Sequence, residues 1–437
     1  MKRLAIVSSY NEKCGNASYT HVLKEALKEH CTVDILSLDL FVLQKTSPKA
    51  RALGNAHIAD LAKKLKEYDY VNIQFEAGLF GSIVSDIWKR TSILIKAAPN
   101  LVFTMHRIDI PSRTLASRYW ASIRRARFLE LHEDTRTFQF EHLYPELIRL
   151  CKTESQKKPV HICVHTKRER RIVTEYFDFA NCLDHPLVYL KEREREQSWA
   201  INNKNGFREK YGLSETSKTI GLFGYLSAYK GVETAIKALA HLPKDYTLVL
   251  FGSQHPQSVK PNVQIDQYLE RLLDTTDEVA DKKANQILRR LKRLPKASVG
   301  LESEVIKTAI EYSIDDRVRF IGNVPDPEFI EALRLCDAVV LPYLEVGQSM
   351  SGVVALATEC GSNLYCSNNS SFAEVRKYYG DVFHSFDIGN YRELAQKVQQ
   401  PGSDFREKRD AVYQKYNISR YSQMLMEIFR KREMQNA

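Results

Sequence analysis

The chain has 437 residues, of which 43% are hydrophobic and 27% charged, and its formal net charge is +10. This composition excludes collagen-like, low-complexity and intrinsically disordered proteins, and the length predicts two or three domains. No apolar run approaches the roughly 18–20 residues that a membrane-spanning helix needs. The first apolar run, Leu4 to Val7, is too short for a signal peptide, so we expect a cytoplasmic protein.

Short apolar runs alternate with helix-like stretches through the first half of the chain. Buried strands are predicted at 4–10, 33–38, 70–76, 101–107 and 160–166, because near-continuous apolar runs are typical of a parallel sheet covered on both faces. Amphipathic patterns at 17–30 and 56–68 predict helices between these strands. This alternation predicts an α/β fold with a doubly wound, mostly parallel sheet.

A basic and aromatic segment, 111–158, interrupts this alternation. Six arginines lie between residues 107 and 127, against one acidic residue. Such a patch suits the phosphates of an anionic membrane, a lipid-linked acceptor or nucleic acid, and a solvated helix face is the structural alternative. The residues predicted to contact an acceptor or a membrane are Arg113, Arg118, Trp120, Arg124 and Arg125.

The second half repeats the first. Strands are predicted at 219–225, 246–252, 317–323, 338–343 and 362–367, with helices at 231–242 and 326–336. The charge-dense segment 191–206 is predicted to be a linker. We therefore predict domains at 1–195 and 205–415, with a C-terminal helix at 416–437 that packs back on the first domain. Segment 256–308 is a second interruption; its basic stretch at 287–296 suits an anionic membrane surface or a solvated helix.

The eight cysteines contain no C-x-x-C pair, which fits reduced, buried thiols in a cytosolic enzyme. The nearest approach to a metal cluster is His161, Cys163 and His165, which alternate along one face of a predicted strand. A packed strand face explains this pattern, and the alternative, a metal site, lacks a fourth ligand. We predict no metal and no cofactor.

Three strand-to-helix loops carry residues suited to binding anions. Gly15 and Asn16 follow the first strand and open a helix, where backbone can approach a ligand. Lys230 stands at a helix start after Gly224, so its ammonium group and the helix dipole suit a diphosphate. The backbone of 349–353 precedes a third helix and predicts a second anion-binding turn, with Ser351 or Gly352 as the cap and Gly361 at the helix end.

The absence of G-x-G-x-x-G after the first strand and of G-x-x-x-x-G-K-[ST] anywhere disfavours dinucleotide dehydrogenases and P-loop NTPases. Two phosphate-type loops in the second half instead suggest a nucleoside diphosphate ligand. His106 ends the fourth predicted strand, where a doubly wound sheet presents functional groups.

Six segments, in order, resemble glycosyltransferase family 4 across nearly the whole chain. They are 14–17 (CGNA), 73–81 (IQFEAGLFG), 104–106 (TMH), 223–231 (FGYLSAYKG), 341–343 (LPY) and 348–356 (QSMSGVVAL). The resemblance implies the GT-B fold, in which two Rossmann-like doubly wound domains face each other across a cleft. It also implies metal-free, retaining transfer of a sugar from a nucleotide-sugar donor to a glycan or lipid-linked acceptor, in polysaccharide biosynthesis of the bacterial kind, with nucleic acid an improbable partner.

The resemblance also implies roles for individual residues. His106 and Lys230 would be catalytic, His106 contacting the transferring sugar and Lys230 clamping the β-phosphate. The donor-binding residues would be Gly15, Asn16, Tyr225, Lys230, Gln348, Ser349, Met350, Ser351, Gly352, Val353 and Glu374. The cytoplasmic protein would then meet its acceptor as a peripheral protein at the inner membrane face.

Three positions depart from the family pattern. Tyr225 stands where the family usually has arginine, and Gln348 and Leu356 replace its paired glutamates. Leucine cannot bind ribose hydroxyls. Two alternatives therefore stay open: a degenerate protein of this fold that serves as a binding or scaffold subunit, and a nucleotide-sugar epimerase.

Overall fold

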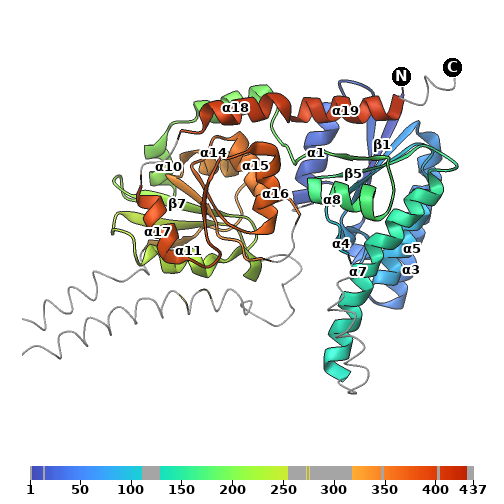
Figure 1. The fold of residues 1–437 in the computed structure, drawn as a ribbon, viewed down its shortest axis with the longest axis horizontal. Helices are drawn as coiled ribbons and strands as arrows, with labels where there is room; N and C mark the ends of the chain where they lie inside the picture. Colours follow the sequence, from blue (N-terminus) through green and yellow to red (C-terminus); the bar gives the residue numbers. More distant parts are fainter. Residues whose placement is uncertain are drawn as a thin grey trace, which may run out of the picture. The chain divides into compact units, whose positions relative to one another are not determined.

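The computed structural model describes residues 2–12, 15–110, 128–253, 272, 275, 317–345, 349–400 and 404–430; in the helix that begins at Phe128, side chains are described from residue 138 onward. The chain divides into two compact units (Figure 1). The first unit contains residues 1–191 together with 415–437, and the second contains residues 192–414. The last helix of the chain therefore belongs to the first unit. Within the described residues, none of the helices is both long and apolar enough to span a bilayer.

The first unit is built on a parallel sheet with the strand order β2-β1-β3-β4-β5-β6. Its strands are β1 (Arg3–Ser8), β2 (Thr32–Ser37), β3 (Tyr70–Phe75), β4 (Leu101–Met105), β5 (Val160–Val164) and β6 (Cys182–Asp184). β1 pairs with β2 on one side and with β3 on the other. The winding direction therefore reverses between β1 and β3, as in a doubly wound sheet.

Helices connect these strands and cover the sheet. They are α1 (Gly15–Leu27), α2 (Leu40–Leu43), α3 (Pro48–Lys64), α4 (Ala77–Phe80), α5 (Val84–Ala97), α7 (Phe128–Glu154), α8 (Lys167–Arg171) and α19 (Ile418–Arg430), with short turns η1 (Leu65–Glu67) and η2 (Ile172–Tyr176). α3 begins earlier than the pattern at 56–68 predicted, because Ser47 caps it and Pro48 occupies its first turn.

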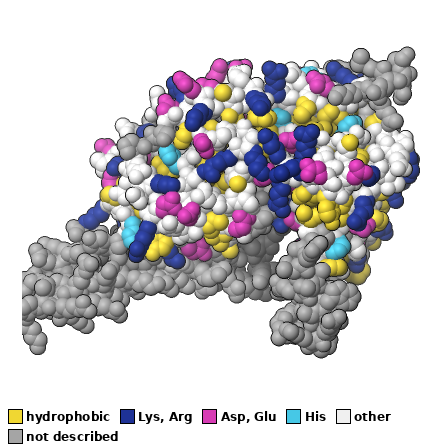
Figure 2. Space-filling model, viewed as in Figure 1, with side chains coloured by type: hydrophobic (Ala, Val, Ile, Leu, Met, Phe, Trp, Pro, Cys, Tyr) yellow, Lys and Arg dark blue, Asp and Glu magenta, His cyan; other side chains and the backbone are white. Residues whose placement is uncertain are grey.

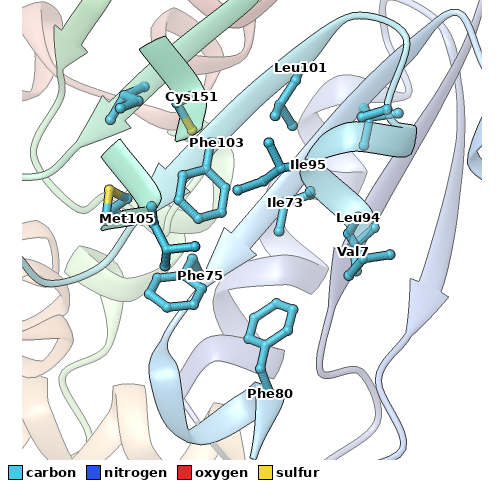
Figure 3. Packing of buried hydrophobic residues seen from close by; sticks show 14 of the residues in the cluster. Val7, Ile73, Phe75, Phe80, Leu94, Ile95, Leu101, Phe103, Met105 and Cys151 are labelled. Atoms are coloured by element: carbon cyan, nitrogen blue, oxygen red, sulfur yellow. The ribbon is translucent and has the colours of Figure 1, made fainter. Parts of the chain in front are cut away.

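One face of this sheet is an apolar core. Ile73 and Phe75 of β3 and Phe103 of β4 pack against α5, and Cys151 of α7 closes the cluster (Figure 3). These side chains are fully buried. The near-continuous apolar runs predicted from the sequence therefore form the strands that fill this core.

The opposite face of the same sheet is polar and is covered by α1 and α19. Asn72 and Gln74 alternate with the apolar residues of β3 and are both fully buried. On this face the Tyr421 hydroxyl of α19 lies 3.3 Å from Cys163 Sγ, and the Phe429 ring stacks on Tyr70 at 4.8 Å. The last helix is thus an integral layer of the first unit.

The second unit repeats the architecture, with the order β12-β11-β10-β7-β8-β9 and all pairs parallel. Its strands are β7 (Lys218–Phe223), β8 (Tyr246–Phe251), β9 (Val318–Phe320), β10 (Ala338–Leu341), β11 (Leu364–Ser367) and β12 (His384–Phe386). The winding direction reverses between β7 and β10. Two doubly wound, six-stranded sheets confirm the predicted α/β fold class.

The helices of the second unit are α9 (Glu192–Ala200), α10 (Lys204–Lys210), α11 (Val232–Leu239), α14 (Asp326–Leu335), α15 (Gly352–Glu359), α16 (Ser370–Tyr379), α17 (Tyr391–Gln399) and α18 (Arg406–Lys415), with a 3₁₀ turn η3 (Ala228–Lys230). Figure 2 shows acidic and basic side chains interspersed over the visible face of this unit.

Two predictions about the chain path were incomplete. The predicted linker 191–206 instead contains α9 and the start of α10, and Trp199 of α9 donates a hydrogen bond from Nε1 to the Glu359 carbonyl at 2.6 Å. The strands β6 and β12 were not predicted, because each is only three residues long and has no apolar run of its own.

The packing of α19 can be tested through Phe429. We expect Phe429→Ala to lower the free energy of unfolding by about 3–5 kcal/mol, because it removes a buried ring that stacks on Tyr70. Chemical denaturation followed by circular dichroism measures this change. Glu427→Ala, an exposed position on the same helix, serves as the control and should change stability by about 0.5 kcal/mol or less. Equal effects of the two variants would contradict this packing.

Candidate active site

Parallel sheets of this kind bind ligands beyond the carboxyl ends of their strands, at the point where the winding direction reverses. In the second unit that point lies between β7 and β10. The loop after β7 carries Gly224, Tyr225 and Lys230, and the loop after β10 leads to the start of α15. The donor-binding segments predicted in the second half of the chain therefore lie at one edge of the second sheet, whereas Gly15 and Asn16 belong to the first unit.

Close backbone contacts hold these two loops together. The Leu344 amide donates to the Tyr229 carbonyl at 2.7 Å. Gly231 adopts a left-handed conformation with φ of 62°, and a Cβ atom there would lie 2.0 Å from the Pro342 carbonyl oxygen. Only glycine fits at this position. The loop that presents Lys230 is consequently fixed against the loop after β10.

Lys230 is buried inside this pair of loops, with 5% of its surface exposed. Its Nζ donates a hydrogen bond to the Tyr343 hydroxyl and lies 4.1 Å from the centre of the Tyr343 ring. Within the described part of the chain, no carboxylate lies within ion-pair distance of this ammonium group. Burial lowers the pKa of Lys230 to about 7.

The start of α15 lies beside Lys230. Ser351 occupies the position before the helix, but its side chain does not cap the first turn; its hydroxyl lies 3.4 Å from that of Tyr343. A Cβ atom at Gly224 would lie 3.3 Å from Lys230 Nζ and 3.6 Å from a methyl group of Val353. The ammonium group and an amino-terminal helix turn without a side-chain cap therefore flank the same glycine, an arrangement suited to an anion.

The neighbouring helix α16 is capped by its own residues. Asn369 accepts from the Phe372 amide at 2.9 Å, and Glu345 accepts from the Ser370 amide at 2.7 Å. Glu374 lies farther along α16 in an ion pair with Lys377. The structure thus distinguishes the start of α15, next to Lys230, from the start of α16, whose donors are satisfied by side chains.

The remaining donor-binding candidates differ in how far the structure describes them. Ser349 and Met350 are buried just before α15, and the Ser349 carbonyl accepts a hydrogen bond from the Ser371 hydroxyl. Tyr225 is half-buried in the loop after β7. Gln348 lies outside the described residues, as does the predicted acceptor patch Arg113, Arg118, Trp120, Arg124 and Arg125.

In the first unit, His106 follows β4 and joins a chain of buried amides. Its Nε2 lies 2.7 Å from Gln74 Oε1, and the Gln74 amide nitrogen donates to Asn72 Oδ1. Asn72 Nδ2 in turn donates to the Val102 carbonyl at 3.1 Å and to the Thr104 hydroxyl at 2.9 Å. His106 is therefore positioned by side chains from two adjacent strands.

Two further histidines lie at the ends of the next strands on the same face. The His165 ring is centred 4.9 Å from that of His106, and His165 Nδ1 lies 2.9 Å from the His185 carbonyl. Burial lowers the pKa of both His165 and His185 to about 4. Burial lowers the pKa of His106 well below its usual value, and the neighbouring His165 contributes a smaller part of this decrease. Burial therefore favours the neutral form of these three imidazoles at pH 7. Cys163 and His165 form part of a packed strand face.

Glu76 follows β3 at the switch point of the first sheet, directly after the pair that Phe75 forms with Met105 of β4. Burial raises its pKa to about 7, and the Arg107 guanidinium partly offsets that rise. The helix after it is held by Arg90, whose Nη1 donates to the Phe80 carbonyl at 2.8 Å. A Cβ atom at Gly81 would lie 2.9 Å from that same nitrogen. The segment 76–81 is thus a fixed turn that presents a carboxyl group titrating near neutral pH.

The loop after β1 lies on the other side of the point where the winding direction reverses, which is between β1 and β3. Gly15 opens α1, and a Cβ atom there would meet no described atom within 4 Å. The Asn16 carbonyl accepts from the Thr20 hydroxyl at 2.7 Å, which fixes the first turn of the helix. Gly15 and Asn16 therefore lie at the predicted edge of the sheet.

A separate cavity of about 600 Å³ lies beside α17 of the second unit, lined by His241, Arg392, Ala395, Gln396, Gln399 and Gln400. It contains none of the predicted residues. The convergence of Lys230, Tyr343 and α15 makes the strand edge the better candidate for chemistry.

Several residues of these clusters were absent from the predicted site. Gln74 and Asn72 carry a signal that was available in the sequence, since they are alternate polar residues inside an otherwise apolar strand. Tyr343 follows β10 directly, at the edge where functional groups gather. The hydrogen bond from Lys230 to Tyr343 joins residues 113 positions apart, and no local pattern predicts it.

Comparisons with known proteins find relatives only at the level of structure. No protein-family model matches the chain, and no curated protein sequence matches it either. HepE of Anabaena, solved with UDP and glucose, superposes with a TM-score of 0.58 at 13% identity over 98% of this chain and 99% of HepE. Sucrose-phosphate synthase of Thermosynechococcus elongatus superposes at 0.58 with 14% identity over 100% of both chains. Trehalose-6-phosphate synthase of Burkholderia multivorans superposes at 0.59 with 13% identity over 100% of this chain and 98% of that one. Similarity over almost the whole chain confirms that this protein has the GT-B fold of two Rossmann-like units.

Proposed function

We propose that the protein is a glycosyltransferase that moves a sugar from a nucleoside-diphosphate sugar to a hydroxyl group of a glycan, lipid-linked or other acceptor. In this proposal the second unit binds the donor and the first unit binds the acceptor. The reaction proceeds with retention, and Lys230 and the start of α15 take the electrostatic role that a metal cation would otherwise have. The protein acts in the cytoplasm, on an acceptor that can lie at a membrane surface.

The observation that carries this proposal is the burial of Lys230 beside the uncapped start of α15. A buried ammonium group without a carboxylate partner is unfavourable until an anion reaches it. The adjacent helix turn offers backbone donors to the same anion. A diphosphate, with two charged groups in sequence, suits a site that combines one cation with one helix terminus.

The chemical step balances without a protein nucleophile. The bond between the anomeric carbon and the diphosphate oxygen breaks, and the acceptor oxygen forms its bond to the same carbon on the same face. The acceptor proton passes to an oxygen of the leaving diphosphate. Lys230 and the α15 amides stabilise the negative charge that develops on this leaving group, which is where preorganised donors accelerate a reaction most.

Structural neighbours support the choice of nucleotide to test first. HepE was solved with UDP and with UDP-glucose, and a trehalose-phosphate synthase of Burkholderia vietnamiensis is described as UDP-forming. We therefore propose a uridine diphosphate sugar as the donor.

One alternative has specific residues in its favour. Tyr225 and Leu356 stand where related enzymes carry a cation and a ribose-binding glutamate, and Leu356 is a half-buried residue of α15. A degenerate binding or scaffold subunit would retain the fold and lose the nucleotide. An epimerase of this fold would bind the nucleotide sugar but release an isomer of it instead of a glycoside.

Nucleotide binding separates these alternatives. We expect UDP at 100 times its Kd to add about 2.7 kcal/mol to the stability of the protein, which raises the midpoint of thermal unfolding by a few degrees or less. Lys230→Ala should abolish this shift and, with a UDP-sugar, lower turnover roughly 10²–10³-fold, because one preorganised donor is lost.

Lys237→Ala, an exposed lysine of α11, is the matched control and should keep the full shift. A panel of UDP, GDP, ADP and CMP in which no nucleotide shifts the wild-type midpoint would support the scaffold alternative. A shift that survives Lys230→Ala would place the nucleotide elsewhere.

The pH dependence of binding tests the state of Lys230. The pKa of Lys230 in the protein without ligand is about 7, so its amine is mostly neutral above that pH. A bound diphosphate favours the ammonium form. Binding at pH 8 should therefore take up a proton, and the affinity for UDP should fall about tenfold per pH unit between pH 7 and 9.

Calorimetry in two buffers of different ionisation enthalpy measures this proton uptake directly. Lys230→Gln should remove it along with most of the affinity. An affinity for UDP that stays constant between pH 7 and 9 in the wild-type protein would contradict the assignment.

A further inference from the structure

A chain of hydrogen bonds with fixed polarity runs through the buried amides of β3 to His106. A backbone carbonyl can only accept, so the group of Asn72 that faces the Val102 carbonyl must be its NH₂. The Asn72 carbonyl oxygen therefore faces Gln74, and Gln74 must present its own NH₂ to it. Each amide thus fixes the orientation of the next.

The last member of this chain is the imidazole. Because the Gln74 NH₂ is committed to Asn72, the Gln74 carbonyl oxygen is the atom that lies 2.7 Å from His106 Nε2. That nitrogen must carry a hydrogen in order to donate. The backbone of β4 consequently determines, through two side chains of β3, which nitrogen of His106 is protonated.

The other nitrogen of His106 points away from this chain. Among the described residues Nδ1 has no hydrogen-bond partner, and unlike His165 Nε2 and His185 Nε2 it is not sealed from solvent. His106 is half-buried, whereas Gln74 and Asn72 are fully buried. The titratable groups in contact with its ring are His165, centred at 4.9 Å, and Tyr19, centred at 5.6 Å.

We propose that Gln74 and Asn72 are positioning residues that hold His106 in the Nε2-protonated form, so that it offers a lone pair at Nδ1 to a hydroxyl group of a ligand bound by the first unit. His106 then selects a hydrogen-bond donor and disfavours the oxygens of a phosphate or carboxylate. The identity of the ligand as a sugar rests on the proposed function. The protonation state of His106 does not.

The low pKa of His106 agrees with this assignment, since a neutral ring keeps the lone pair available at pH 7. The neutral ring of His106 in the first unit differs from the group in the second unit, where Lys230 supplies a cation. Each unit therefore offers the opposite kind of group: a cationic donor in the second and a neutral acceptor in the first.

Nuclear magnetic resonance of the full-length protein, labelled with ¹⁵N-histidine, tests the protonation state without a ligand. A long-range ¹H–¹⁵N correlation spectrum separates the two neutral forms of an imidazole, and His106→Gln identifies the His106 signals. At pH 7 we expect the proton of His106 on Nε2. His165, whose Nδ1 faces the His185 carbonyl, should carry its proton on Nδ1 and is the internal control. A proton on His106 Nδ1, or a doubly protonated ring at pH 7, would overturn the inference.

Two variants of Gln74 test the relay itself. Gln74→Leu removes the acceptor at similar volume and should give His106 a mixture of the two neutral forms, while the His165 signals stay unchanged. Gln74→Glu restores an acceptor with a negative charge and should raise the pKa of His106 by roughly 1–3 units. A single Nε2-protonated form in Gln74→Leu would show that another group sets the form of His106.

Discussion

The contact between the loops after β7 and β10 is the constraint on which the candidate site of the second unit depends. Lys230 has 5% of its surface exposed, and the Tyr343 hydroxyl is its one hydrogen-bond partner among the described residues, so other forces hold it in place. Those forces are the backbone contacts between the loops after β7 and β10, including the close approach of Gly231 to Pro342. The loops are joined where the winding of the sheet reverses, so the fold itself brings Lys230 to the start of α15.

The first unit uses the same edge of the same type of sheet for different chemistry. Its polar layer is made of neutral groups, with the amides of Asn72 and Gln74 leading to His106 and with α19 covering the face. Burial keeps these imidazoles uncharged, whereas burial in the second unit leaves an amine poised to gain a proton. Glu76 adds a carboxyl group at the end of β3, and burial raises its pKa to about 7. In the proposed reaction, the cationic site at Lys230 binds the leaving diphosphate, and the neutral site at His106 accepts hydrogen bonds from hydroxyl groups.

The sequence predicted the α/β fold because buried parallel strands are near-continuous apolar runs, and those runs were visible from Leu4 to Cys366. It also identified the loops that carry His106 and Lys230, since strand-to-helix turns bear glycine and polar residues. It did not predict β6 and β12, which are too short to form a pattern. Gln74 was visible as a polar residue inside an apolar strand, but its pairing with His106, like that of Tyr343 with Lys230, depends on contacts between distant strands that no local pattern predicts.

Hydrogen–deuterium exchange with and without UDP tests the central claim most directly, because it reports where the nucleotide meets the backbone. The account predicts slower exchange in peptides covering 224–231 and 349–356, where the loop of Lys230 and the start of α15 lie. Peptides from the first unit at 160–176 should serve as an unchanged reference. Protection confined to 391–400, beside the cavity at α17, or confined to the first unit, would contradict the assignment of the diphosphate site.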